Sequence, residues 1–252
     1  MKLAAQLYTL REYTQTETDY YNTCVKVKNM GYSSVQLSGA GPMEAKTVKS
    51  ISDELNLPVT ATHIPHTMFV NELDKVIQNH KIMGCKYVGL GYMPKEYWES
   101  VSTLNEFITT YSKVAKALDK EGLRFVYHNH HFEFFKFKGK TMMDIILENT
   151  PSCFFFLPDT YWIQAAGANP VYWIKKLKGR GDYIHFKDMG IGSDYKTTFV
   201  PVGQGNLDWQ SIIEACRYAE VKYIAVEQDT CEGSPFDALK ASYDYLSSMG
   251  LK

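Results

Sequence analysis

The sequence is poor in cysteine and has no excess of charge of either sign. Its five cysteines are scattered without a Cys-x-x-Cys pair, and five cannot all pair within one chain. We therefore expect free thiols in a reducing compartment, which favours a cytoplasmic protein. The 27 basic and 28 acidic residues give a formal net charge of -1, so nothing in the charge balance indicates a nucleic-acid partner or an anionic membrane.

Long hydrophobic runs are also missing. No stretch approaches the roughly 20 apolar residues that cross a bilayer, so we expect no membrane partner. The N-terminal residues 1–11, MKLAAQLYTLR, have a hydrophobic stretch interrupted by Gln6, which is too short for a secretory signal. The Gly-x-Gly at Gly203 and Gly205 does not link a strand to a helix, so a dinucleotide-binding loop is not indicated there. These absences favour a small-molecule partner.

Eight short apolar runs recur along the chain, and each is followed by a polar loop and a helical pattern. The runs are almost continuously hydrophobic, which is typical of parallel strands covered on both faces. They lie at residues 2–8, 34–38, 58–63, 86–91, 123–130, 153–159, 182–188 and 222–228. Eight β-then-α units without a linker predict the α/β class and a single (β/α)8 TIM barrel domain over residues 1–252, in preference to a doubly wound open sheet.

Polar side chains gather where the predicted strands end. In a barrel the carboxyl ends of all strands converge on one mouth, where catalytic groups lie. Any one of these residues has a structural explanation, as a helix cap, a turn residue or a paired core histidine. Four neighbouring strands that end in carboxylate or imidazole are harder to explain in that way. The polar residues at these ends are His63, His128, Asn129, His130, Glu133, Asp159, His185, Lys187, Asp188 and Glu227.

Four of these residues form a candidate metal site: Glu133, Asp159, His185 and Glu227. Three carboxylates and one imidazole suit Mn²⁺, Mg²⁺, Co²⁺ or Fe²⁺, and they can also hold Zn²⁺. No cysteine lies at these strand ends, so a thiolate zinc site is not expected. We expect one divalent metal ion, with Mn or Zn favoured.

Several motifs, in this order and spacing, resemble the xylose isomerase-like TIM-barrel superfamily. The resemblance is closest to its sugar phosphate isomerase/epimerase branch, whose members include inosose dehydratase and ketose 3-epimerases. It covers essentially the whole chain and implies a metal held by residues from the fifth to eighth strands. The motifs are LYTLR, YHNHHFEF, PDTYW with AAGANP, IHFKD, VGQGNLDW and VEQD.

Carried onto this sequence, the ligands that the resemblance implies are again Glu133, Asp159, His185 and Glu227. The fifth strand departs from the common Glu-Asn-His pattern, because this chain has His128-Asn129-His130 there. Either Glu133 reaches back to the metal or His128 replaces the carboxylate, and we favour Glu133. In the second strand, relatives often carry Glu where this chain has Gln36, which argues against an acid-base role at that position.

The predicted activity is a metal-dependent isomerase or epimerase of a sugar, sugar phosphate or related polyol ketone. Such a site removes the proton next to a carbonyl and stabilises the enediolate. We assign Glu133 and Glu227 as the catalytic carboxylates on opposite faces of the substrate, while Asp159 and His185 mainly hold the ion. The predicted substrate-binding residues are His63, His128, His130, Lys187, Asp188, Tyr8 and Trp162.

Three alternatives remain. The same residues would make a dehydratase or lyase of the inosose dehydratase type if the enediolate expels a β-hydroxyl. A DNA-repair endonuclease of this fold with three zinc ions would need more ligands and a basic face, against which the net charge of -1 counts. A non-catalytic sugar-binding barrel is the third, although the carboxylate-rich set argues against a structural metal. The resemblance also implies a homodimer or homotetramer.

Overall fold

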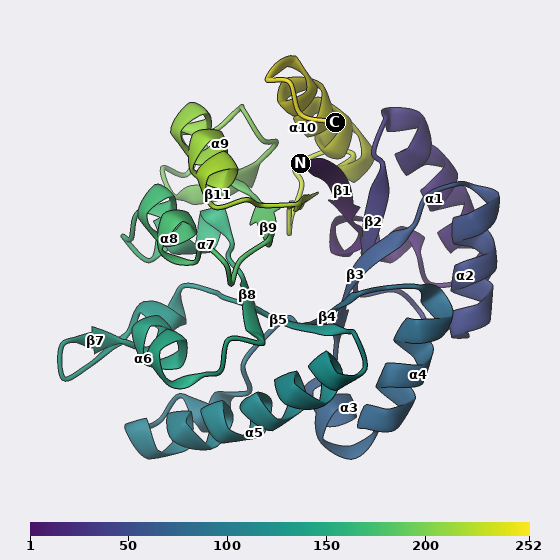
Figure 1. Ribbon diagram of the computed structural model, residues 1–252. Coiled ribbons are helices and arrows are strands. Elements are labelled where there is room, and N and C mark those ends of the chain that lie inside the picture. Colours follow the sequence, from purple (N-terminus) through teal and green to yellow (C-terminus); the bar gives the residue numbers. More distant parts are fainter.

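Eight parallel strands form the centre of the protein, and helices surround them (Figure 1). The computed structural model describes all residues, 1–252. The strands are hydrogen-bonded in the order β8-β5-β4-β3-β2-β1-β12-β9, and a bridge between Asp159 and His185 brings the two outer strands together. The predicted (β/α)8 barrel is therefore confirmed. Its strands are β1 (Lys2–Gln6), β2 (Ser34–Leu37), β3 (Val59–Ile64), β4 (Tyr87–Leu90), β5 (Arg124–His128), β8 (Phe154–Leu157), β9 (Tyr183–Phe186) and β12 (Tyr223–Val226).

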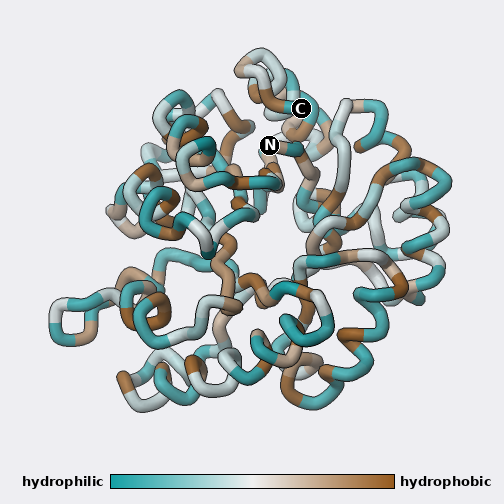
Figure 2. Tube along the Cα trace, in the orientation of Figure 1, coloured by the Kyte–Doolittle hydropathy of each residue, from teal (hydrophilic) through white to brown (hydrophobic).

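The outer ring consists of ten α-helices, along which hydrophobic and hydrophilic residues are interspersed (Figure 2). This pattern is expected of helices that pack one face on the strands and leave the other in water. Side chains of Thr16, Ser100, Thr141 and Ser234 cap the first turns of four of them. The helices are α1 (Glu17–Met30), α2 (Ala45–Glu54), α3 (His66–Asn71), α4 (Leu73–Met83), α5 (Val101–Lys120), α6 (Met142–Asn149), α7 (Thr160–Ala165), α8 (Pro170–Lys176), α9 (Trp209–Tyr218) and α10 (Pro235–Ser248).

Two small hairpins and three 3-10 turns decorate this frame. The strands β6 (Lys136–Phe137) and β7 (Lys140–Thr141) pair after β5, and β10 (Asp188–Ile191) pairs with β11 (Thr197–Val200) after β9. The 3-10 turns are Leu7–Tyr13, Lys95–Tyr97 and Phe132–Phe134. None of the helices combines the length and apolar character that crossing a membrane requires.

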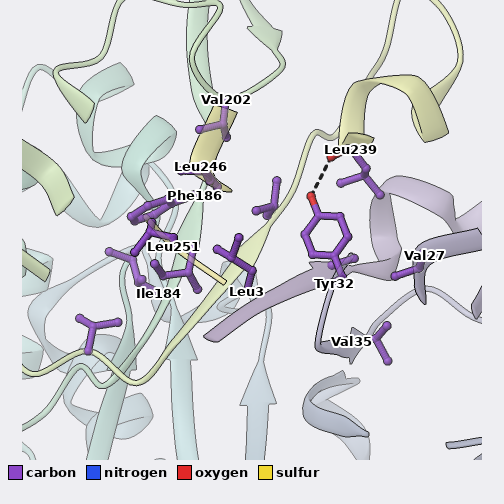
Figure 3. Packing of buried hydrophobic residues seen from close by; sticks show 14 of the residues in the cluster. Leu3, Val27, Tyr32, Val35, Ile184, Phe186, Val202, Leu239, Leu246 and Leu251 are labelled. Carbon is purple, nitrogen blue, oxygen red and sulfur yellow. Dashed lines mark hydrogen bonds between the residues drawn. The ribbon is translucent and has the colours of Figure 1, made fainter. Parts of the chain in front are cut away.

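The first and last units of the barrel are joined through buried contacts. Tyr32, which precedes β2, donates its hydroxyl proton to the carbonyl oxygen of Leu239 on α10 at 2.8 Å (Figure 3). The backbone N–H of Leu3 donates to the carbonyl oxygen of Lys252 at 3.2 Å, so the two termini lie side by side. Leu246 and Leu251 pack with Leu3 in the same core cluster. These contacts hold β1 beside β12 and help to close the barrel.

The interior of the barrel is apolar at one level and polar at the next. A buried layer is formed by Ala4, Ala61, Tyr87, Val126, Leu157, Tyr183 and Ala225. Because side chains alternate along a strand, the residues two positions later face the same interior, one layer closer to the mouth. Those residues are Gln6, His63, Gly89, His128, Asp159, His185 and Glu227. The apolar layer is therefore the floor on which the polar residues lie.

Candidate metal centre and cavity

Four ionisable side chains meet above the apolar floor at the carboxyl ends of β5, β8, β9 and β12. His128, Asp159, His185 and Glu227 each offer one ligand atom, and these four atoms lie within 4.8 Å of one another. The Nε2 atom of His128 is 3.1 Å from Oδ2 of Asp159, and Nδ1 of His185 is 2.8 Å from Oε2 of Glu227. All four side chains are at most 5% exposed. We refer to these four residues as the donor set.

The remaining nitrogen of each histidine is held by an oxygen atom. Nδ1 of His128 lies 3.2 Å from the carbonyl oxygen of Gly91, and Nε2 of His185 lies 2.8 Å from Oε1 of Gln36. An oxygen acceptor requires the proton on the nitrogen that faces it, so in the neutral imidazole that a metal requires, the lone pair of the other nitrogen is directed at the donor set. Gln36 is thus a positioning residue for His185. The sequence alone did not suggest this role.

The donor set fits a divalent ion. Nδ1 of His185 and Oε2 of Glu227 are buried and lack a well-oriented hydrogen bond, although they are close together. Buried polar atoms without a well-oriented hydrogen bond are costly, and a shared cation would satisfy both. Two imidazoles and two carboxylates suit Zn²⁺, Mn²⁺, Fe²⁺ or Co²⁺ better than an all-oxygen site would. No cysteine belongs to the set.

Lys187 provides the positive charge beside this set. Its Nζ atom lies 3.0 Å from Oε2 of Glu227, 3.4 Å from Oδ2 of Asp159 and 2.9 Å from Oδ1 of Asp229. Burial alone would lower the pKa of Lys187, but the three carboxylates outweigh it and raise the pKa, so the ammonium stays charged. The pKa values of Asp159 and Glu227 lie below the ordinary range. Burial alone would raise them, but the charge of Lys187 and the nearby imidazoles outweigh burial and lower both.

The second carboxylate next to Lys187 behaves differently. Burial and the neighbouring charge of Glu227 raise the pKa of Asp229 to about 6, although Lys187 opposes the shift. Asp229 and Glu227 are the carboxylates that line the cavity above the donor set. The sequence signal for Asp229 was its place two residues after Glu227, on the same side of the chain, but we did not assign it to the site.

A cavity of about 770 Å³ opens above the donor set. His63 and His130 both line this cavity, and each has a buried nitrogen atom without a hydrogen-bond partner, Nε2 in His63 and Nδ1 in His130. Burial lowers the pKa of His63 well below its ordinary value and that of His130 to about 2, so both imidazoles are neutral. The polar and aromatic residues around the opening include Tyr8, Arg11, His63, His66, Tyr92, His128, His130, Lys187, Glu227 and Asp229.

Glycines on β4 and just after it make room for His63. A Cβ atom on Gly91 would lie 2.8 Å from Nδ1 of His63, and one on Gly89 would lie 2.7 Å from its Cδ2 atom. Both distances are shorter than real side chains tolerate, so the ring can lie there only while these positions are glycine. His63 is thereby fixed with its ring centroid 5.3 Å from those of His128 and His185.

Glu133, the ligand that we favoured for the fifth strand, is not part of the donor set. Its carboxylate accepts a hydrogen bond from the hydroxyl of Tyr127 and another from the backbone N–H of His130 at 2.8 Å. Tyr127 faces away from the barrel interior and packs on Phe107 of α5, because it alternates with His128. Glu133 is therefore held outside the barrel wall, and His128, the alternative that we weighed, lies in the set.

Asp188 also lies away from the cavity that we expected it to line. It follows Lys187 directly, so its side chain points to the other face of the chain. Its carboxylate accepts hydrogen bonds from the backbone N–H groups of Gly203 and Gly205 and from Nε1 of Trp209, at 2.8, 3.0 and 2.6 Å. Asp188 thus fixes the loop before α9, and it is not among the residues that line the cavity.

Of the two predicted aromatic contacts, Tyr8 lies at the cavity and Trp162 lies behind one of the lining residues. Tyr8 lines the cavity, and the guanidinium carbon of Arg11 lies 4.4 Å from its ring centroid. Trp162 lies behind His130, with ring centroids 5.2 Å apart, and its buried Nε1 atom has no hydrogen-bond partner. Arg11 was not among the predicted site residues, because nothing in the LYTLR motif indicated that its guanidinium reaches the cavity.

Comparison with known proteins supports the same fold family. The family model described as "Xylose isomerase-like TIM barrel" matches residues 24–248. No curated protein sequence matches the chain. Among solved structures, a sugar phosphate isomerase/epimerase from Parabacteroides distasonis ATCC 8503 is similar with a TM-score of 0.85 and 20% identity, over 98% of this chain and 93% of that one.

Two further structures share the architecture at lower identity. An L-ribulose 3-epimerase has a TM-score of 0.77 and 14% identity, over 98% of this chain and 94% of its own. The IOLI protein with a bound zinc atom has a TM-score of 0.74 and 13% identity, over 98% and 97% of the two chains. At these identities the likeness establishes the fold alone.

Proposed function

Because the chain belongs to the xylose isomerase-like TIM-barrel family, we propose that it is a divalent-metal-dependent isomerase or epimerase. The proposed substrate is a sugar, a sugar phosphate or a related polyol ketone. The observation that carries the proposal is the buried donor set, His128, Asp159, His185 and Glu227, at the base of a polar cavity. The likeness to an L-ribulose 3-epimerase and to a zinc-bound barrel supports it by analogy.

The donor set would hold one divalent ion, for which we favour zinc or manganese. Such an ion would polarise a carbonyl and its neighbouring hydroxyl and so make the α-proton more acidic. The chain itself contributes the preformed ligand directions: Gln36 and the carbonyl of Gly91 fix the two imidazoles before any ligand arrives. Asp159 is fixed as well, because its Oδ1 atom accepts from the backbone N–H of Trp162 at 2.9 Å.

Proton transfer is assigned to the two carboxylates that line the cavity. Glu227 keeps the role that we expected of it, and Asp229 takes the place of Glu133, which lies outside the barrel wall. A general base must reach the proton that it removes, and Asp229 lines the cavity that would hold the substrate whereas Glu133 does not. Lys187 lies 2.9 Å from Asp229, and its ammonium can stabilise negative charge that develops next to it.

Substrate oxygens are assigned to the neutral imidazoles and the lysine. His63 and His130 direct unpartnered nitrogens in this region, so each gains a hydrogen bond when a hydroxyl or carbonyl group arrives. Lys187 adds a charged donor at the same wall. Tyr8 offers a flat apolar surface at the cavity, which suits the face of a sugar ring, and Trp162 packs behind His130.

Two measurements test this function together. Purified protein loaded with Mn²⁺ or Zn²⁺ is incubated in D₂O with a panel of ketoses, ketose phosphates and inososes, and ¹H NMR follows loss of the α-proton signal. We expect metal-dependent exchange with at least one substrate in the wild type and none in Asp159→Asn. NMR of the product separates an epimer or isomer from the unsaturated ketone of the dehydratase alternative. A protein that binds metal but exchanges no α-proton in the panel would favour the sugar-binding alternative.

A further inference from the structure

Lys187 and a divalent ion require the same carboxylate oxygens. The ammonium lies 3.4 Å from Oδ2 of Asp159 and 3.0 Å from Oε2 of Glu227. These are also the oxygens that approach the imidazole nitrogens of the donor set. Oδ1 of Asp159 is already used as a helix cap, so Oδ2 is the atom that Asp159 has left to offer. A bound cation and Lys187 therefore cannot share these atoms without a cost.

The buried charges add up to what one divalent ion would neutralise. Asp159, Glu227 and Asp229 carry three negative charges, and Lys187 carries one positive charge, which leaves -2 when the imidazoles are neutral. Ligation itself requires neutral imidazoles. A single divalent cation brings this sum to zero, provided that Lys187 keeps a carboxylate of its own. Asp229 is that carboxylate, since its Oδ1 atom is only 2.9 Å from Nζ and it lies outside the donor set.

We propose that Lys187 is a built-in counter-ion that competes with the divalent ion for Asp159 and Glu227, and that Asp229 retains it when the ion binds. This inference rests on the proposed metal site and goes beyond it, because it names the residues that set the affinity of the site. Lys187 keeps the donor set assembled without metal, at the expense of weaker metal binding. Asp229 limits that weakening by offering the ammonium another partner.

The test is a double-mutant cycle on metal affinity. Mn²⁺ binding to the metal-free full-length protein is measured by isothermal titration calorimetry in the wild type, Lys187→Met, Asp229→Asn and the double variant. Lys187→Met is expected to bind Mn²⁺ about tenfold more tightly, as removal of a contacting like charge should allow. Asp229→Asn is expected to bind about fivefold more weakly, because Lys187 then has only the donor-set oxygens.

The double variant separates competition from a simple loss of negative charge. If Asp229 acts through Lys187, Asp229→Asn should change the affinity less than about twofold in the Lys187→Met background. Lys196→Met is the matched control, because the side chain of Lys196 is 81% exposed. The Mn²⁺ affinity of this variant should equal that of the wild type. Equal or weaker Mn²⁺ binding by Lys187→Met would overturn the inference, as would an equal effect of Asp229→Asn in both backgrounds.

A folding failure does not remove the test. If Lys187→Met cannot be purified, Asp229→Asn alone decides, since unchanged or tighter binding contradicts the proposed role of Asp229. This affinity test is also independent of the α-proton exchange test of the proposed function. Failure of the wild type to exchange an α-proton leaves the order of affinities untouched, whereas a wrong order of affinities leaves any observed exchange intact.

Discussion

The Oε1 atom of Gln36 lies 2.8 Å from Nε2 of His185, although the two residues are 149 positions apart in the chain. They meet because β2 and β9 both direct these side chains into the barrel, two residues beyond Ser34 and Tyr183. The contact fixes the protonated nitrogen of His185 and turns Nδ1 towards Glu227. A glutamine at this position is thus suited to a neutral hydrogen bond inside the barrel.

Gln36→Leu should weaken metal binding by about 10- to 100-fold, which is the usual effect of losing a partner that orients a ligating histidine. The leucine fills similar space but cannot accept the proton of His185. Gln36→Glu is the control that keeps an acceptor oxygen, and it should retain most of the affinity. Titration with Zn²⁺ against a competing chelator checks both. An unchanged affinity in Gln36→Leu would show that His185 is held without this contact.

Gly91→Ala should disturb the cavity through His63. The added Cβ atom would lie 2.8 Å from Nδ1 of His63, and overpacking of this kind costs about 1–3 kcal/mol of unfolding free energy. Gly233→Ala is the matched control, because a Cβ atom there meets nothing within 4 Å. Urea titrations of both variants measure the difference. Equal unfolding free energies would mean that the His63 ring is free to move aside.

Glu133 should make the free energy of unfolding depend on pH, and the variant Glu133→Gln should lack this contribution. Burial raises its pKa to about 7, against the hydrogen bonds from Tyr127 and His130 that lower it. The folded protein then binds this proton more tightly than the unfolded chain does. Rising pH therefore removes stability between the ordinary glutamate pKa, about 4.3, and about 7.

The comparison is between the wild type and Glu133→Gln in urea titrations at pH 5, 6 and 7. The unfolding free energy of the wild type relative to the variant should fall by about 1–3 kcal/mol over this range. Other titrating groups are common to both proteins and cancel in the difference. A difference that stays constant from pH 5 to pH 7 would contradict the raised pKa.

The fold, and the place of the site at the carboxyl ends of the strands, could be predicted because both follow from short-range patterns in the sequence. Eight apolar runs of strand length, each followed by a helical repeat, are enough to indicate the barrel. Strand alternation then places His128, Asp159, His185 and Glu227 on the interior, and it would also have excluded Asp188, which directly follows the inward-facing Lys187. Our prediction for Asp188 used the strand end alone and ignored the alternation, whereas the structure places its carboxylate on the loop before α9.

The remaining features depend on geometry that no local pattern contains. Glu133 lies in a 3-10 turn after β5, and whether it turns to the barrel or to α5 is decided by the hydroxyl of Tyr127. The bond between Gln36 and His185 joins strands that are not neighbours in the sheet. Asp229 belongs to the site because a long lysine side chain reaches it. Such contacts between distant residues become visible only in the folded chain.

Elemental analysis of purified protein tests the central claim most directly. After incubation with Mn²⁺ or Zn²⁺ and removal of free ions, the wild type and Glu133→Gln should each retain about one divalent ion per chain, because the chain has one such four-residue donor set. Asp159→Asn and His128→Ala should lose it. A wild type that retains no metal would contradict the account, and so would a metal that is lost in Glu133→Gln but kept in His128→Ala.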